Sequence, residues 1–205
     1  MSAAVIFKLG GSYASSAQRT DWLDAIESCA GQVILVPGGG PFADAIRIAQ
    51  RAMQFDDRAA HHMALLAMEQ YGCALASRRP RLRLAGSAEE IRSVLAHEDV
   101  PVWAPTRMVL AATELPQRWE LSSDSLAAWL AGILGVSSLL LVKRIAGIEG
   151  VSAANLAAKG VVDALFPRFL GASGAEAYIA GPADHAAAAA AIRRGGPPGS
   201  RIALP

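Results

Sequence analysis

The chain has 205 residues, of which 53% are hydrophobic and 18% are charged, and its formal net charge is +1. This size and composition predict a single globular domain over residues 1–205 and exclude a disordered chain. The near-neutral charge argues against a nucleic-acid-binding protein or one held on an anionic membrane. The longest apolar run, 126–136, is shorter than the ~20 residues that span a bilayer. Cys29 and Cys73 lie far apart and form no CxxC motif, so we expect a cytoplasmic protein with reduced thiols.

Short β-rich runs alternate with helical patterns along the chain. Strands are predicted at 4–9, 32–36, 81–85, 100–105, 137–142 and 177–181, with a last strand at 199–204. Helices are predicted at 21–30, 42–52, 56–72, 88–97, 124–135 and 182–194. The signals for helix ends are Thr20 or Asp21, Ser87 with Glu90, and Ser122 or Ser123 at N-termini, and Gly72 and Gly135 at C-termini.

This alternation predicts the fold class α/β, with a mostly parallel central sheet covered by helices on both faces in an αβα sandwich. In open sheets of this kind, ligands bind at the carboxyl ends of the strands. The residues directly after each predicted strand are therefore the first candidates for a functional site.

Two of the predicted strands end in glycine loops. The first loop holds Gly10, Gly11 and Ser12, and the second holds Gly38, Gly39 and Gly40. Glycine leaves backbone N–H groups open to a ligand, and a helix start adds a positive dipole end that suits phosphate. Neither loop matches the P-loop or the GxGxxG motif. The alternative is that the glycines only make tight strand-to-helix turns, but two such loops behind a lysine favour a phosphate site.

Four charged residues are candidates for the site, although a solvated side chain at the end of a strand is the alternative for Lys8. Lys8 lies inside the first apolar strand, and Lys143 and Arg144 follow the strand at 137–142. An ammonium group beside a transferring phosphoryl group stabilises the charge that develops there. Asp124 begins a strongly apolar helix. It caps that helix, orients two cations across the site, or holds a metal-bound nucleotide.

These pieces, in this order, resemble the amino acid kinase family. The resemblance rests on "KLGGS", "PGGGPF", "SSDSLAAWLA", the cationic loop after "LLLV" and the closing "YIAGPADHAAAAAAIRRGGPPGSRI". It implies transfer of the γ-phosphoryl group of ATP with Mg²⁺, and Lys8, Asp124 and Lys143 as catalytic residues. The ATP-binding residues that it implies are Lys8, Gly10, Gly11, Ser12, Lys143, Arg144 and Gly147. Where the family usually has Asp, this chain has Ala146.

Several segments, including "DDRAAHHMALLAMEQYG" and "WAPTRM", are similar to a subgroup that phosphorylates aminomethylfuranylmethyl phosphate in methanofuran biosynthesis. The acceptor-binding candidates are Gly38, Gly39, Gly40, Asp44, Arg47, His61 and Trp103. Trp119 is an alternative to Trp103 for covering a flat ring, and Asp56 or Asp57 is an alternative to Asp44 for an amine.

Other interpretations stay open at this level. The acceptor is alternatively UMP or isopentenyl phosphate, or the chain is a non-catalytic sensor of a nucleotide or oxyanion. His61 and His62 point about 100° apart on a helix and do not easily share one ion, so we expect no protein-held metal. The resemblance also implies a homodimer or higher homo-oligomer, with "HHMALLAM" as the candidate contact surface.

Overall fold

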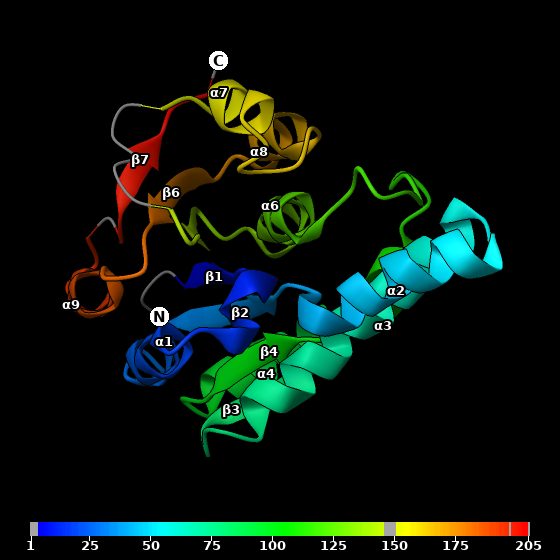
Figure 1. Ribbon diagram of the computed structural model, residues 1–205. Coiled ribbons are helices and arrows are strands. Elements are labelled where there is room, and N and C mark those ends of the chain that lie inside the picture. Colours follow the sequence, from blue (N-terminus) through cyan, green and yellow to red (C-terminus); the bar gives the residue numbers. More distant parts are fainter. Residues whose placement is uncertain (1–3, 146–150, 197, 205) are drawn as a thin grey trace.

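A computed structural model describes residues 4–145, 151–196 and 198–204 (Figure 1). Within these residues, strands form one seven-stranded sheet in the order β3-β4-β2-β1-β5-β6-β7. The strands are β1 (Val5–Leu9), β2 (Val33–Pro37), β3 (Leu82–Ala85), β4 (Val100–Trp103), β5 (Ser138–Val142), β6 (Glu176–Ala180) and β7 (Ser200–Ile202). All neighbouring strands are parallel except β7, which runs antiparallel to β6. The predicted α/β sandwich with a mostly parallel sheet is confirmed.

Helices cover both faces of the sheet. They are α1 (Gln18–Glu27), α2 (Gly40–Met53), α3 (Asp57–Ala76), α4 (Ala88–Ala96), α5 (Thr106–Ala111), α6 (Ser123–Leu134), α7 (Ala153–Ala158), α8 (Phe166–Ser173) and α9 (His185–Arg193), with a 3-10 turn η1 (Gly11–Ser15). Figure 1 shows α1 and α9 on one side of the sheet and α6 with α8 on the other, while α2 and α3 project away side by side.

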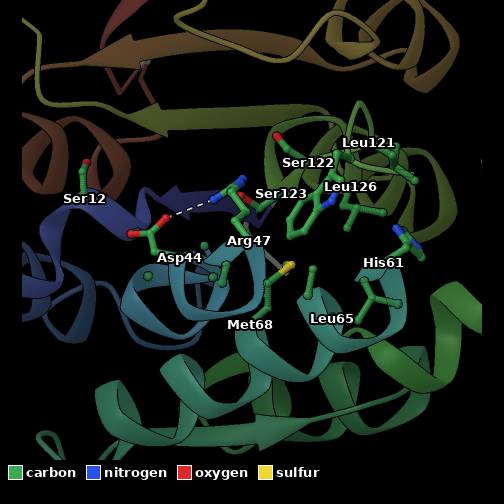
Figure 2. A pocket seen from close by; sticks show the side chains of 17 residues that line it. Ser12, Asp44, Arg47, His61, Leu65, Met68, Leu121, Ser122, Ser123 and Leu126 are labelled. Atoms are coloured by element: carbon green, nitrogen blue, oxygen red, sulfur yellow. Dashed lines mark hydrogen bonds and ion pairs between the residues drawn. The ribbon is translucent and has the colours of Figure 1, made fainter. Parts of the chain in front are cut away.

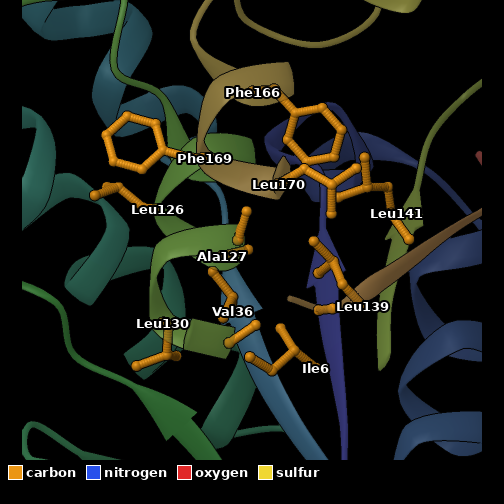
Figure 3. Close-up of a cluster of buried hydrophobic side chains, with 14 of the residues drawn as sticks. Ile6, Val36, Leu126, Ala127, Leu130, Leu139, Leu141, Phe166, Phe169 and Leu170 are labelled. Carbon is orange, nitrogen blue, oxygen red and sulfur yellow. The ribbon is translucent and has the colours of Figure 1, made fainter. Parts of the chain in front are cut away.

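The alternation of side chains along β1 divides the core in two. Val5, Phe7 and Leu9 belong to the cluster under α1 and α9, whereas Ile6 belongs to the cluster under α6 and α8. Figure 3 shows this second cluster, in which Ile6 and its neighbours on β2 and β5 lie below apolar side chains of α6 and α8. Lys8, two residues after Ile6, faces the α6 side by the same period of two.

The predicted end of the third helix at Gly72 is wrong, because α3 continues through Gly72 to Ala76. A Cβ atom at Gly72 would lie 3.2 Å from Val102 Cγ1 and 3.4 Å from Pro37 Cγ. The glycine therefore serves close packing of α3 on the sheet, and not the termination of the helix. Three short helices, α5, α7 and α8, were not predicted.

Candidate active site

The two glycine loops lie against each other at the carboxyl ends of β1 and β2. A Cβ atom on Gly11 would lie 2.4 Å from the backbone nitrogen of Gly40, and one on Gly38 would lie 2.5 Å from that of Gly11. Gly40 also has a φ of +54°, which favours glycine. Close backbone packing is thus one physical reason for the glycine run, and it brings both loops to one edge of the sheet.

Lys8 and Lys143 meet on the same face because neighbouring strands share their register. Lys8 pairs with Leu141, and Leu9 pairs with Val142, so Lys143 lies just beyond the paired residues of β5. On β5, Leu141 belongs to the α6 side of the core and Val142 to the other side. Lys143 is the next position on the α6 side. Two lysines separated by 135 positions in the sequence numbering are thereby directed at one helix end.

Asp124 receives both ammonium groups. Lys143 Nζ donates a hydrogen bond to Asp124 Oδ2 at 2.6 Å, and Lys8 Nζ forms an ion pair with Oδ1 at 2.8 Å. The Lys8 contact lacks the alignment of a hydrogen bond, so Oδ1 has no hydrogen-bond donor within the described part of the chain. The side chains of Lys8 and Asp124 are each only 5% exposed. This buried cluster has two positive charges and one negative charge, which suits an anionic ligand.

The pKa values in the cluster reflect burial and mutual charge. Burial alone would raise the pKa of Asp124, but the charges of Lys8 and Lys143 outweigh it and hold this pKa below its usual range. Burial, followed by the positive charge of Lys8, lowers the pKa of Lys143 to about 8, against the opposing effect of Asp124. Asp124 is therefore ionised at neutral pH, whereas Lys143 loses its proton about one pH unit above neutrality.

Residues other than Asp124 cap the N-terminus of α6, so the carboxylate of Asp124 is available for the lysines. The N-cap is Ser122, and Asp163, from the segment between α7 and α8, accepts hydrogen bonds from Ser122 Oγ at 2.6 Å and Ser125 N at 3.1 Å. Ser125 Oγ also donates to Asp163. Asp163 was not predicted from the sequence, because nothing in the local pattern around it indicates a contact with Ser125, 38 residues earlier.

Lys143 and Arg144 occupy different environments. Lys143 belongs to the buried cluster, whereas Arg144 is exposed and its Nη1 donates to the carbonyl of Ser12 at 3.4 Å. Tyr13 adds a further link, because its hydroxyl donates to the carbonyl of Lys143 at 3.1 Å. Gly147 lies outside the described residues, so its predicted role stays a prediction.

A cavity of about 340 Å³ begins at the glycine loops and ends at α3 (Figure 2). Residues from four segments of the chain line it: Gly11, Ser12, Gly38, Gly39, Gly40, Ala43, Asp44, Arg47, His61, Ala64, Leu65, Met68, Trp119, Leu121, Ser122, Ser123 and Leu126. Six of the seven predicted acceptor-binding residues line this cavity, and Trp103 is the exception. Trp103 does not line the cavity as predicted. It is fully buried in the core, where its Nε1 donates a hydrogen bond to Met108 Sδ.

Trp119 is the aromatic residue of the cavity. The guanidinium carbon of Arg47 lies 4.5 Å from the centre of its ring, and Arg47 also pairs with Asp44 at 3.0 Å. Trp119 Nε1 donates to Gln50 Oε1 at 2.7 Å, and Gln50 in turn donates to Asp57 at 2.9 Å. These contacts fix the indole against α2, so the cavity has a flat aromatic surface beside a cation and a carboxylate.

His61 lies at the other end of the cavity, among Leu65, Leu121 and Leu126 and away from Ser12 (Figure 2). It is 3% exposed, and its Nε2 has no hydrogen-bond partner among the residues that the structure describes. Burial lowers the pKa of His61, although a hydrogen bond with the Arg118 backbone opposes this shift. His61 is therefore neutral at pH 7 and offers a hydrogen bond, not a positive charge.

The described residues contain no group of three or more His, Cys, Asp or Glu side chains that could hold a metal ion. Both carboxylate oxygens of Asp124 are also engaged by lysines. The described residues thus provide no carboxylate cage for Mg²⁺, an ion that reaches kinase sites largely on the phosphates of the nucleotide. None of the described helices is both long and apolar enough to cross a membrane.

Comparisons with known proteins show the family and the fold. The model of the amino acid kinase family matches residues 3–151. A [5-(aminomethyl)furan-3-yl]methyl phosphate kinase of Methanocaldococcus jannaschii is 23% identical over 147 residues, which are 70% of this chain and 67% of that protein. The crystal structure of uridylate kinase from Archaeoglobus fulgidus has a TM-score of 0.72 at 19% identity, covering 98% of this chain and 100% of that chain.

An isopentenyl phosphate kinase structure has a TM-score of 0.63 at 16% identity and covers 97% of this chain and 100% of that chain. At these identities the structures show the shared fold. The family model, in contrast, covers well over half of the sequence. The chain belongs to the amino acid kinase family and is a kinase.

Proposed function

We propose that this protein transfers the γ-phosphoryl group of ATP to a phosphate monoester, and that this acceptor is [5-(aminomethyl)furan-3-yl]methyl phosphate. The observation that carries the proposal is that the cavity is lined by the sequence neighbours of Asp124 and by both glycine loops, although the three charged side chains themselves do not line it. Ser122 and Ser123, next to Asp124, line the cavity together with both glycine loops. An acceptor in the cavity would present its phosphate to these loops and to the lysines behind them.

The chemistry needs positioning and charge neutralisation more than proton transfer. One oxygen of a phosphate monoester is already ionised at neutral pH, so it can attack the γ-phosphorus without a general base. Lys8 and Lys143 would neutralise charge on the transferred group, and Asp124 would hold the two ammonium groups in place. Backbone N–H groups at Gly11 and Gly40 would contribute further donors. Mg²⁺ bound to the nucleotide would neutralise additional phosphate charge.

The two ends of the cavity differ in the chemistry that they offer to an acceptor. Arg47, Asp44 and the glycine loops form a polar end, where Arg47 suits phosphate and Asp44 suits an ammonium group. Trp119 offers a face for a flat ring. Apolar side chains and a neutral His61 close the other end. A small, flat phosphate monoester that carries an amine fits this set, in agreement with the name of the 23% identical relative.

The apolar lining keeps a second acceptor class in consideration. Leu65, Met68, Leu121 and Leu126 would also accommodate the hydrocarbon of isopentenyl phosphate, and the whole-chain fold likeness extends to kinases of that substrate and of UMP. The non-catalytic sensor is not proposed, because the chain is a member of a kinase family and retains all three charged groups.

The test is ADP release from Mg·ATP with the furan phosphate, UMP and isopentenyl phosphate, for the wild type and Lys8→Met. We expect turnover with the furan phosphate, reduced on the order of 10²–10³-fold by Lys8→Met because a preorganised charge is lost. Lys159→Met is the matched control, since Lys159 is exposed at the end of α7. Turnover with UMP or isopentenyl phosphate alone would refute the furan acceptor but keep the mechanism.

We also propose that the chain is a homo-oligomer. Met63 and Leu66 are 37% and 40% exposed on α3, inside the segment "HHMALLAM". Light scattering during size-exclusion chromatography should show at least a dimer, and Leu66→Glu should shift it toward the monomer. An unchanged mass in Leu66→Glu would exclude this surface.

A further inference from the structure

We propose that Asp163 is a positioning residue for phosphoryl transfer, which holds the N-terminus of α6 so that Asp124 stays bound to the two lysines. This inference rests on the proposed function. It assigns a role to a carboxylate that lies outside the cluster and the cavity lining, in the segment between α7 and α8.

Asp163 makes four hydrogen bonds, and three of them come from residues on either side of Asp124. Oδ2 accepts from Ser122 Oγ at 2.6 Å and from Ser125 N at 3.1 Å, and Oδ1 accepts from Ser125 Oγ. The fourth donor is the backbone N–H of Leu165 at 3.0 Å, which fixes the carboxylate to its own segment. Asp163 thus joins the start of α6 to a part of the chain far away in sequence.

The arrangement divides two tasks between two carboxylates. The free N–H groups at a helix start attract a negative charge, and a carboxylate in the first turn ordinarily satisfies them. In α6 the carboxylate of Asp163 supplies this interaction, and the carboxylate of Asp124 turns to Lys8 and Lys143. Without Asp163, the free N–H groups would compete with the lysines for Asp124.

The same contacts reach the acceptor cavity. Ser122 donates to Asp163 and also lines the cavity, next to Ser123. A shift of the α6 N-terminus would therefore move one wall of the cavity together with Asp124. Displacements on the order of 1 Å in such positions can cost ~10²-fold in rate.

Asp163→Asn is the sharpest variant, because the amide has the shape of the carboxylate but replaces one acceptor oxygen with an NH₂ group. Whichever way the amide lies, its NH₂ faces a backbone N–H that needs an acceptor, either that of Ser125 or that of Leu165. We expect kcat to fall about 10- to 100-fold, with the KM for ATP changed less than about threefold. Asp163→Ala, which removes the acceptors without adding a donor, should lower kcat in the same way.

The pH profile distinguishes positioning from a general loss of stability. Among the residues that the structure describes, the charged groups that face Lys143 are Asp124 from α6 and Lys8 from β1. Asp124 raises the pKa of Lys143, and Lys8 lowers it. If Asp163→Asn loosens Asp124 from Lys143, the alkaline limb of kcat/KM moves to lower pH. A merely structural role would lower the melting temperature and leave this limb in place.

The control is Glu90→Gln. Glu90 also accepts a backbone hydrogen bond at a helix start, from Gly86 N at 2.7 Å, and it pairs with Arg107; Gly86 directly follows β3, the strand at the edge of the sheet. It should change neither kcat nor the alkaline limb. Folded Asp163→Asn and Asp163→Ala with the kcat and the alkaline limb of the wild type would overturn the proposal.

If the wild type phosphorylates a different acceptor, the same comparison is made with that acceptor. If it phosphorylates none of them, the proposed function fails, but the role of Asp163 can still be tested. The pKa of the Lys143 ammonium group is then measured by NMR titration in the wild type and in Asp163→Asn. The same pKa in both proteins would refute the inference.

Discussion

The titration of Lys143 provides a direct test of whether its charge acts in phosphoryl transfer. Burial and the neighbouring Lys8 lower its pKa to about 8. The ammonium form predominates below this pH and is lost above it. Lys143 should carry its charge in about 90% of the enzyme molecules at pH 7 and in about 10% at pH 9. If the charged form is required, kcat/KM for ATP should be roughly tenfold lower at pH 9 than at pH 7.

The assay is steady-state ADP release between pH 5.5 and 10, with kcat/KM reporting the free enzyme. In the wild type the alkaline limb should bend near pH 8 in kcat/KM and at higher pH in kcat, because bound phosphates favour the charged lysine. Asp124 should not contribute to the pH dependence between pH 5.5 and 10, because its pKa is lowered below the usual range of a carboxyl group. An acid limb near pH 6 is expected from the acceptor phosphate itself.

Lys143→Arg is the matched variant for this prediction, since a guanidinium group remains charged throughout the range. We expect lower overall activity, because its planar geometry differs from that of an ammonium group beside Asp124. Its kcat/KM should nevertheless stay level above pH 8. A wild-type profile that is flat to pH 9.5, or the same limb in Lys143→Arg, would refute the assignment of the limb to Lys143.

Five further variants test the site and the fold. Trp103→Ala should lower the free energy of unfolding by about 3–5 kcal/mol, measured by urea denaturation, because it removes a fully buried ring. Trp119→Ala should instead raise the acceptor KM and have a smaller effect on the free energy of unfolding. A larger loss of stability in Trp119→Ala than in Trp103→Ala would contradict both placements. His61→Leu should raise the acceptor KM and leave the ATP KM unchanged, whereas the exposed neighbour variant His62→Leu should change neither; equal effects of the two would remove His61 from the site. Gly11→Ala should reduce kcat and the melting temperature together, because its Cβ would lie 2.4 Å from a backbone nitrogen, and wild-type values would show that the loops are free to move apart.

The fold and most of the polar cluster were predictable from sequence because they depend on local patterns. Alternating strands and helices give the parallel sheet, and strand ends collect Lys8, the glycine loops and Lys143 at one edge. The period of two along β1 and β5 then directs both lysines toward α6. Each step uses residues that are neighbours in sequence or in a regular strand.

The errors occurred where long-range packing overrides a local signal. Gly72 carries the sequence signal of a helix end, but the closeness of Val102 explains it better. Trp103 and Trp119 were equivalent candidates in the sequence, and only burial separates them. No local pattern connects Asp163 to α6, because hydrogen bonds across 38 positions leave no periodic trace.

These observations also bear on the interpretations of Asp124. An acidic residue in the first turn of an apolar helix is ordinarily stabilised by the helix dipole, and sequence alone does not distinguish that role from catalysis. In this protein, Ser122 and Asp163 satisfy the helix start, and Asp124 is buried between two ammonium groups. Burying three charges together is costly unless they are paired, and one carboxylate cannot neutralise two lysines. The remaining positive charge lies near two glycine loops and a cavity, which suits a phosphoryl group and supports the proposed role of the cluster in phosphoryl transfer.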